Sequence, residues 1–263
     1  MELDLSKVEF SHNDKRLGIK VPTELTEDLA YFMGVHVGDG YMKIQKRKSA
    51  IDYKLQYSGH FINEYAWYQF ILSPLINKLF NKENYLKKSN SNSVSICFRS
   101  KAILTFMHHA CGIQLSPKKN IDVPEIIKNA NLSIKAAFIR GLVDTDGSLV
   151  FKNSGRNPTI DISTSSKALY DTLQELISEL GIGFYSCVYH TSRNLTPIIQ
   201  YKIQINGKKK LAKWIELVGF SSYNHLTKYL VWKTTGSLKP YTNIHERIEI
   251  LEKKKRPGGD LNS

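Results

Sequence analysis

The sequence predicts an α+β fold in which one αββαββα unit occurs twice in tandem, around a pseudo-twofold axis. The first observation is an internal repeat: residues 29–40 (LAYFMGVHVGDG) and 136–147 (AAFIRGLVDTDG) are both typical of apolar helices with an internal glycine and a final Asp-Gly. A constant offset of 107 positions pairs further residues: Asp39 with Asp146, Lys101 with Lys208, Leu104 with Leu211 and Gly112 with Gly219. The second is a set of strand-like stretches with one apolar face. The third is a length of 263 residues, close to two domains of about 150 residues each.

Each copy is expected to start with the repeated helix. Thr23 or Thr26, followed by acidic residues, is typical of a helix N-terminus in the first copy, and Ser133 takes that position in the second. Two strands follow, then a long amphipathic helix, two more strands and a closing helix that ends at Gly112 or Gly219. The expected long helices span 63–80 and 165–180, and the linker spans 117–124. The predicted segments are an N-terminal arm (1–22), a first repeat (23–122), a second repeat (123–220), and a C-terminal helical extension with a basic tail (221–263).

The predicted strands alternate between apolar and hydrogen-bonding side chains. In 200–206 (QYKIQIN), Gln, Lys, Gln and Asn face one way, while Tyr, Ile and Ile face the other. Segments 93–99 and 159–163 alternate in the same manner. A single strand of this kind is most simply a solvated sheet face. Because Gln, Asn, Lys, Arg and Ser dominate and Glu is nearly absent, both sheets are also suited to reading base edges in a major groove.

The charge balance favours a polyanionic partner. The chain has 37 Lys and Arg against 24 Asp and Glu, a net charge of +13, although residues 1–28 hold only four of those bases and seven of the acids. Three widely spaced cysteines predict free thiols and not a disulfide framework. No run approaches the ~18 apolar residues of a membrane span, and the N-terminus lacks a signal-peptide pattern. We therefore expect a protein that binds nucleic acid and no membrane, in a prokaryotic cytoplasm beside the nucleoid or in an organellar matrix.

Asp39 and Asp146 each end a predicted helix, where the helix dipole already places partial negative charge. A carboxylate at that position calls for a nearby cation. Glycines within the two helices would let them pack closely and bring the two aspartates together around Mg²⁺, which accepts carboxylates, water and phosphate oxygens. Each Asp-Gly alone is also typical of an ordinary turn. The agreement of two copies within a whole repeat favours the metal site.

These motifs resemble the paired motifs of the LAGLIDADG homing endonucleases, in the single-chain, two-motif form of archaeal and organellar introns. The second motif (IRGLVDTDG) is close to the family consensus, whereas the first (FMGVHVGDG) is looser, with His36 and Gly38 where the consensus prefers other residues. The resemblance covers about residues 23–230. It implies a monomer whose two antiparallel sheets form a saddle on double-stranded DNA. It also implies an enzyme that cuts both strands of a long, specific site across the minor groove and leaves short 3′ overhangs.

Carried over to this chain, the resemblance implies that Asp39 and Asp146 bind two or three Mg²⁺ ions, with the carbonyls of Gly38 and Thr145 as further ligands. Mn²⁺ or Ca²⁺ would substitute in binding. The implied reaction is in-line attack of water on the scissile phosphate, with a second ion at the leaving 3′-oxygen. Asp144 is expected to support the helix interface instead, because its counterpart in the first copy is a valine.

Basic and amide residues are expected around this centre and along the sheets. Lys101, Lys208 and Gln56 are the candidates for catalysis, with His60 as an alternative to Gln56 and plain phosphate contact as the competing interpretation of the lysines. The expected contacts to bases are those of Arg with guanine and of Gln with adenine. The candidates for DNA binding are Lys43, Gln45, Arg47, Lys54, Gln56, Arg99, Lys152, Arg156, Arg193, Gln200, Lys202 and Gln204.

Three rival functions are an intron RNA maturase, a non-cutting DNA-binding regulator and a generic basic RNA-binding module, which would leave the two matched aspartates unexplained. An intron RNA maturase, with intron RNA as its partner, would use the same fold, and some family members do both jobs. A regulator that binds DNA without cutting it would be expected to have lost the two aspartates, which are present. An endonuclease embedded in a self-splicing protein is disfavoured, because the chain starts at Met1, no His precedes Asn262 and the repeats leave little room.

Overall fold

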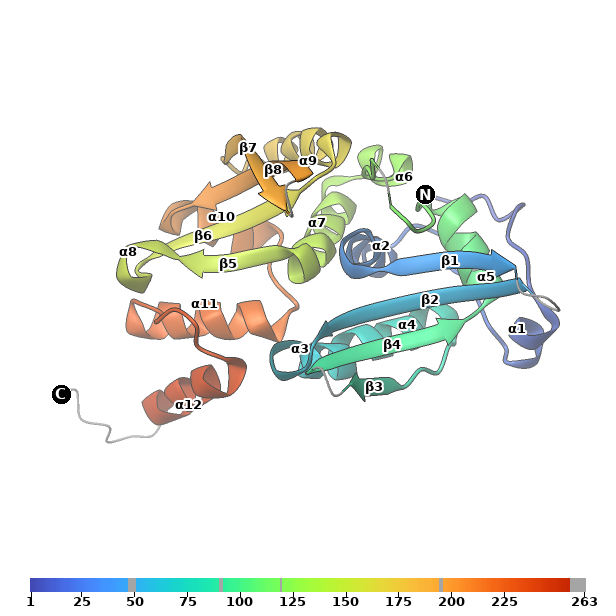
Figure 1. Ribbon diagram of the computed structural model, residues 1–263, viewed down its shortest axis with the longest axis horizontal. Helices are drawn as coiled ribbons and strands as arrows, with labels where there is room; N and C mark the ends of the chain where they lie inside the picture. Colours follow the sequence, from blue (N-terminus) through green and yellow to red (C-terminus); the bar gives the residue numbers. More distant parts are fainter. Residues whose placement is uncertain (47–50, 90–91, 119, 194–195, 256–263) are drawn as a thin grey trace.

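The computed structural model describes residues 1–46, 51–89, 92–118, 120–193 and 196–255, and within them it has two αββαββα units (Figure 1). The first antiparallel sheet has the order β1-β2-β4-β3 and the second β5-β6-β8-β7, so the order of strands is the same in both copies. The strands of the first sheet are β1 (Tyr41–Lys46), β2 (Ile51–His60), β3 (Leu86–Ser89) and β4 (Ser93–Arg99). Those of the second are β5 (Gly147–Phe151), β6 (Asn157–Thr164), β7 (Tyr185–Arg193) and β8 (Thr196–Asn206). The predicted α+β, two-sheet fold is confirmed.

The helices follow the predicted order with small shifts at their ends. The long helix of the first copy consists of α3 (Phe61–Trp67), a π-helical turn (Tyr68–Leu72) and α4 (Ser73–Phe80), and its counterpart is α9 (Lys167–Glu179). The closing helices are α5 (Lys101–Thr105) with a π-helical turn (Phe106–Ala110), and α10 (Lys208–Leu217). Gly112 and Gly219 follow them with φ of +71° and +72°, the left-handed conformation that terminates helices.

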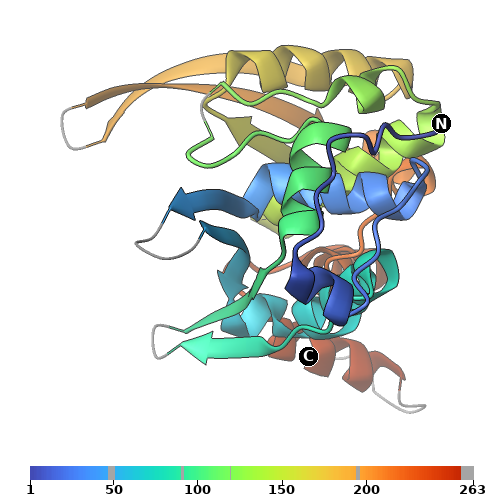
Figure 2. The same cartoon turned by 90° about the vertical axis from the view of Figure 1, so that its right-hand side faces the viewer.

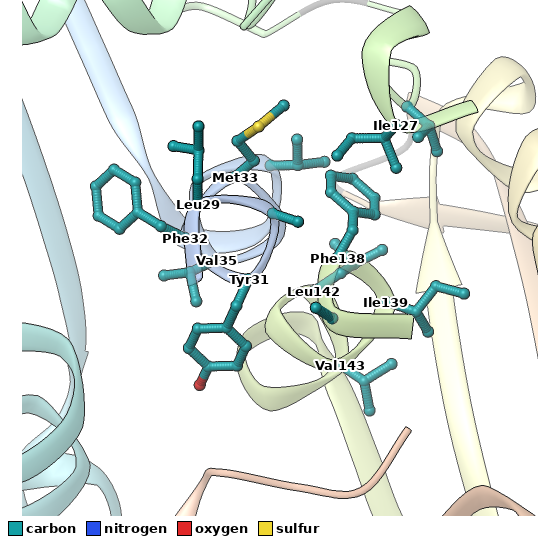
Figure 3. Packing of buried hydrophobic residues seen from close by; sticks show 14 of the residues in the cluster. Leu29, Tyr31, Phe32, Met33, Val35, Ile127, Phe138, Ile139, Leu142 and Val143 are labelled. Atoms are coloured by element: carbon teal, nitrogen blue, oxygen red, sulfur yellow. The ribbon is translucent and has the colours of Figure 1, made fainter. Parts of the chain in front are cut away.

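The central helices α2 (Glu27–Asp39) and α7 (Leu132–Asp146) pack side by side between the two sheets (Figures 1 and 3). Thr26 caps α2 through its Oγ1, which accepts from the Leu29 amide at 3.3 Å. The expectation that Ser133 caps α7 is wrong: the cap is Asn131, whose Oδ1 accepts from the Ile134 amide at 3.0 Å. An Asn side chain satisfies the first-turn amides as well as Ser does, so the helix starts two residues earlier than expected.

Glycines set the separation of the two central helices. A Cβ built on Gly34 would lie 2.0 Å from the Phe138 carbonyl oxygen, and one built on Gly141 would lie 2.1 Å from the Tyr31 carbonyl oxygen. The two contacts are images of each other under the repeat offset, which is the signature of a pseudo-twofold axis between the helices. Buried side chains such as Met33 fill the space around them (Figure 3).

Each sheet buries one face against helices and exposes the other. In β4, burial alternates along the strand: Val94, Ile96 and Phe98 are buried, and the residues between them are not. In the second sheet Ile160, Ile162, Ile203 and Ile205 are buried in the same way. The predicted alternation is therefore confirmed, with one exception at Thr159, which is 1% exposed and donates to Asn206 Oδ1. Figure 2 shows the strands of both sheets extending toward the same side of the molecule.

The segments outside the repeats pack onto them. In the N-terminal arm, α1 (His12–Arg16) carries Asp14, whose carboxylate accepts from the Ser100 hydroxyl and the Ala102 amide at the start of α5. Between the repeats lies the short α6 (Glu125–Lys128), and a turn labelled α8 (Lys152–Gly155) follows β5. The C-terminal α11 (Tyr223–Thr235) and α12 (Ile244–Lys255) pack on each other, and α11 also contacts α3 and β5. Within the described ranges, no helix is long and apolar enough to cross a membrane.

Candidate active site and nucleic-acid interface

The two aspartates predicted from the repeat come together at the ends of α2 and α7. A Cβ on Gly38 would lie 2.1 Å from Thr145 Oγ1 and 3.4 Å from Asp146 Cγ, so the last turns of the helices touch. The carboxyl groups of Asp39 and Asp146 lie close enough together that each affects the pKa of the other. Gly40 and Gly147 then turn the chain directly into β1 and β5. Each sheet therefore starts at the acidic centre.

Electrostatics at this centre disfavour two negative charges. Burial, the neighbouring carboxylate of Asp146 and that of Glu64 together raise the pKa of Asp39 from 3.8 to about 7. The pKa of Asp146 is also raised, because the surrounding protein desolvates it even though part of its side chain remains exposed. Two carboxylates this close interact as a pair, and one proton or one cation between them relieves their repulsion.

The donor set fits a divalent cation that also binds water and phosphate. Within the described residues, no three His, Cys, Asp or Glu side chains come together as a closed metal cluster. A pair of carboxylates at an open site suits Mg²⁺, which retains waters and accepts substrate oxygens, better than it suits Zn²⁺. The residues that would hold such an ion are Asp39 and Asp146.

Lys118 also lies at this centre, although no motif or repeat in the sequence marks it. Its Nζ donates to the carbonyl oxygens of His36, Val37 and Gly38 at 2.9, 2.8 and 2.8 Å, which caps the C-terminus of α2. Burial lowers the pKa of Lys118, whereas the charges of Asp146 and Asp39 raise it. The Gly38 carbonyl, predicted as a metal ligand, thus already accepts a hydrogen bond from this ammonium group. The predicted role of the Thr145 carbonyl stays a prediction.

A neutral, buried layer lies directly behind the carboxylates. His36 is fully buried, its Nδ1 is 2.8 Å from the Tyr57 hydroxyl, and burial and then the charge of Lys118 lower its pKa to about 3. A Cβ on Gly40 would lie 2.5 Å from the His36 ring, so His36 and Gly40 fit together. This departure of the first motif from the family consensus therefore packs without adding a charge beside the acidic pair.

Asp144 has the supporting role that its sequence position suggested. Its carboxylate is buried and accepts from the Tyr31 hydroxyl at 2.9 Å and the Ser221 amide at 2.8 Å. The Tyr31 hydroxyl in turn accepts from Trp67 Nε1 at 3.0 Å. These bonds tie α7 to α2, to α3 and to the segment that leads into α11.

Among the other catalytic candidates, the structure brings Gln56 near the centre but not the two lysines. Gln56 pairs across the strands with Tyr41, two residues after Asp39, and donates to Ser58 Oγ at 3.0 Å. Lys101 begins α5 and forms an ion pair with Glu9 of the N-terminal arm, and Lys208 begins α10 at 5.9 Å from the Trp232 ring centre. Both helices start at the sheet ends away from the aspartates, where the Ser100 amide donates to the Tyr53 carbonyl and the Gly207 amide to the Pro158 carbonyl. The offset of 107 thus identified equivalent helix starts.

A second acid near Asp39 was also missed. Glu64, on α3, is close enough to raise the pKa of Asp39, and its own pKa is raised by burial. Its Oε2 accepts from the His60 amide at 2.6 Å, and it lies where a Cβ on Gly59 would be. His60 itself caps α3 through Nδ1. A single Glu in the first turn of an amphipathic helix carries no signal that separates it from an ordinary capping residue.

The exposed face of the first sheet carries the predicted DNA-binding residues in register. Lys43 lies opposite Lys54, which lies opposite Arg99 on β4, so three cations form a row across the sheet. Arg99 Nε donates to Asp52 Oδ1 at 2.7 Å. Gln45 is exposed on β1. Like charges in one row repel each other unless a polyanion lies over them.

The second sheet has a similar face. Lys202 lies between Ser163 and Cys187, and Gln204 lies between Asp161 and Tyr185. Lys202 forms an ion pair with Asp161 at 3.1 Å. The predicted residues Lys152, Arg156 and Gln200 are exposed on the same half of the molecule. Arg47 and the side chain of Arg193 lie outside the described residues.

The acidic pair leads to an expected effect on stability in metal-free buffer. The folded pKa of Asp39, about 7, lies above the ordinary 3.8, so the folded state holds a proton that the unfolded state has lost. The contribution of Asp39 to the free energy of unfolding therefore falls as pH rises from 3.8 to about 7, and it is least favourable above pH 7. We expect Asp39→Asn to stabilise the metal-free protein at pH 8 by roughly 1–3 kcal/mol and much less at pH 4.5. Urea denaturation at the two pH values measures this, and destabilisation at pH 8 would contradict it.

Comparison with known proteins agrees with this geometry. Residues 133–219 match a family model described as a LAGLIDADG-like domain. The structure of the homing endonuclease I-DmoI in complex with DNA and Mn is 17% identical, covering 74% of this chain and 98% of that one, with a TM-score of 0.52. That of the LAGLIDADG homing endonuclease I-GzeII in complex with its DNA target is 12% identical, covering 90% of this chain and 99% of that one, with a TM-score of 0.51. At these identities the likeness is one of fold.

Curated relatives share a segment with this chain. An uncharacterized protein of Methanocaldococcus jannaschii is 28% identical over 80% of this chain and 23% of its own length. The ribonucleoside-diphosphate reductase NrdEB subunit alpha of Bacillus subtilis is 22% identical over 86% of this chain and 22% of its own length. The chain thus spans about a fifth of the length of these relatives, and their names share no common activity. The chain has the LAGLIDADG homing endonuclease fold, and its residues 133–219 match the LAGLIDADG-like domain model.

Proposed function

We propose that the protein is a site-specific double-strand DNA endonuclease that depends on divalent metal ions. The observation that carries the proposal is the pair of carboxyl groups at the touching ends of α2 and α7, with the pKa of each raised and a polar, basic sheet starting beside each one. A protein that only held RNA or DNA would gain nothing from two carboxylates that disfavour each other's charge. The two complexes of this fold with DNA support the same function.

The pseudo-twofold arrangement supports cleavage of both strands by one chain. Each sheet would lie along the major groove of one half-site, and the two aspartates between them would face the minor groove at the centre. Because the two halves differ in their polar side chains, we expect the recognised site to be asymmetric. One chain already supplies both halves, so we propose that it acts as a monomer on a long site and leaves short 3′ overhangs, as expected for intron homing.

The residues of the chain have distinct tasks in this reaction. A divalent ion at the site would compensate phosphate charge and make water more acidic. Asp39 and Asp146 would hold that ion through their ionised carboxylates. Lys118 places a positive charge beside both carboxylates, where it attracts the scissile phosphate and stabilises negative charge that develops on its oxygens. The neutral His36 behind them keeps water away from that side of the centre.

The roles of Lys118, Lys101 and Lys208 can be distinguished experimentally. We expect Lys118→Met to slow cleavage about 10–10²-fold, since one preorganised cation beside the phosphate is lost. Lys101→Met and Lys208→Met remove the same charge at the sheet ends away from the aspartates, so they should weaken DNA binding and leave single-turnover cleavage of bound DNA within about threefold. Single-turnover rates at saturating protein measure the difference. Equal rate losses in all three variants would contradict this assignment.

The proposed function is tested by mapping breaks in DNA. Purified protein is incubated with Mg²⁺ and genomic DNA whose candidate intron-insertion sites are uninterrupted. All new DNA ends are then sequenced. We expect breaks at one or a few sites, with staggered 3′ ends. Asp39→Asn should lose them, while Asp171→Asn, an exposed aspartate on α9 that pairs with Lys167, should retain them. No site-specific breaks together with tight, specific DNA binding would favour a non-cutting regulator, and tight intron RNA binding instead would favour a maturase.

A further inference from the structure

A pocket of about 410 Å³ lies at the junction of the C-terminal extension with both repeats. Its walls come from α11, α12, β5 and the segment 238–242, and Asn63 of α3 closes one side. Three of its lining side chains are cations, Lys228, Lys239 and Arg247, and none of its lining side chains is acidic. No task in the proposed cleavage reaction uses this pocket.

Arg247 is the most unusual residue of the pocket. It is 1% exposed, and its guanidinium donates to Thr227 Oγ1, to the Thr242 carbonyl and to Asn224 Oδ1 at 3.0, 2.8 and 2.7 Å. These acceptors are all neutral, and no ion pair joins Arg247 to an acid in the part of the chain that the structure describes. A charge removed from water without an ion pair is costly, and the charge of the adjacent Glu246 offsets only part of the effect of burial on Arg247.

Lys228 adds a second positive charge on the same wall. It lies one turn after Asn224 on α11 and is partly buried. Burial, and then the charge of Arg247, lower its pKa to about 8, so it still carries its proton at pH 7. Two neighbouring cations in one pocket repel each other, and an anion between them stabilises both charges.

We propose that this pocket binds a phosphate group. The guanidinium and the ammonium would carry the charge, since arginine and lysine are the usual phosphate ligands. Asn224 and the exposed Lys239 stand beside them at the wall and the rim. The apolar share of the lining, from Leu149, Phe151 and Leu238, limits water around the charges and strengthens their attraction for an anion.

The phosphate could come from DNA or from solution, and the proposal holds for either source. Val150, a lining residue, is 38% exposed on β5, the strand that directly follows Asp146 and belongs to the second polar sheet. A backbone phosphate of DNA lying along that sheet would have a short path to the pocket. A free phosphate or a phosphorylated metabolite would use the same ligands. Phosphate binding in this pocket does not require DNA cleavage.

The test uses the full-length protein and two probes at pH 7. Inorganic phosphate is titrated by calorimetry at constant ionic strength, with chloride as the balancing anion. Separately, binding of a 30-base-pair random duplex is measured from low to high salt. Lys228→Met is compared with Lys233→Met, which removes the same charge from the last turn of the same helix, at an exposed position outside the pocket. Arg247→Met is avoided, since loss of its three bonds would disturb α11 and α12 themselves.

We expect Lys228→Met to weaken phosphate binding about tenfold or more, or to reduce the salt slope of duplex binding by about one, while Lys233→Met changes neither. A change confined to the phosphate titration assigns the pocket to free phosphate, and a change confined to the salt slope assigns it to the DNA backbone. Equal behaviour of the two variants in both measurements overturns the proposal, because the pocket would then contribute no more than its surface charge.

Discussion

Replacement of Asp146 by asparagine is expected to slow DNA cleavage roughly 10³-fold or more, with little loss of DNA affinity. The side chain keeps its size, so α7 can end as before, but only one carboxylate is left to hold a divalent ion. Loss of a charge that stabilises the transition state by several kcal/mol accounts for a factor of this size. Because one site serves both strands through the paired aspartates, we expect nicking and double-strand cleavage to fall together. Single-turnover kinetics on the site found by break mapping measure both.

The control for this variant is Asp171→Asn. Asp171 is exposed on α9 and pairs with Lys167, so this variant loses one negative charge without touching the centre. It should cleave within about twofold of the unmodified protein. An unchanged cleavage rate in Asp146→Asn, with circular dichroism showing a folded protein, would remove Asp146 from the reaction.

The largest expected loss of stability comes from alanine at Gly141. The added Cβ would lie 2.1 Å from the Tyr31 carbonyl oxygen and 2.9 Å from the Val35 amide nitrogen, and both are backbone atoms that cannot rotate away. The helices must separate, and the packing that joins the two repeats is lost along their length. We expect a loss of about 3 kcal/mol or more in the free energy of unfolding, above the usual cost of one extra methyl group. Chemical denaturation measures it.

A glycine without such a contact is the matched control. At Gly183 the nearest atoms to an added Cβ are Cε and Nζ of Lys210, at 3.3 and 3.4 Å, and this flexible side chain can move. Gly183→Ala should therefore stay within about 0.5 kcal/mol of the unmodified protein. Similar free energies for the two variants would show that helix contact at Gly141 is looser than these distances require.

Much of the fold follows from the sequence because its evidence is local and occurs twice. Helix periodicity, alternation along strands and the offset of 107 positions all depend on residues near each other in the chain, and each half supports the interpretation of the other. The same offset relates Gly34 to Gly141 and Tyr31 to Phe138, which form the reciprocal contacts at the helix pair. The start of α7 was missed, because Asn131 and Ser133 are both good caps within one turn.

The rest of the centre could not be read from the sequence, because it depends on tertiary contacts that the repeat does not duplicate. Lys118 lies in the linker, and the position 107 residues later is His225, which lies 3.7 Å from Asp144 and has a different role. A search for matched pairs therefore passes over Lys118. It selects Lys101 and Lys208 instead, because equivalent positions at the sheet ends away from the aspartates also keep their residue type.

The most direct test of a shared metal site is a double-mutant cycle on Mn²⁺ binding. Electron paramagnetic resonance measures the binding, with the mapped DNA site present. The four proteins are the unmodified chain, Asp39→Asn, Asp146→Asn and the double variant. If the two carboxylates hold ions jointly between α2 and α7, each single variant should lose most of the binding, and the double variant should lose little more. Losses that add independently, or Mn²⁺ binding that survives in the double variant, would contradict the assignment of the metal site to this pair of aspartates.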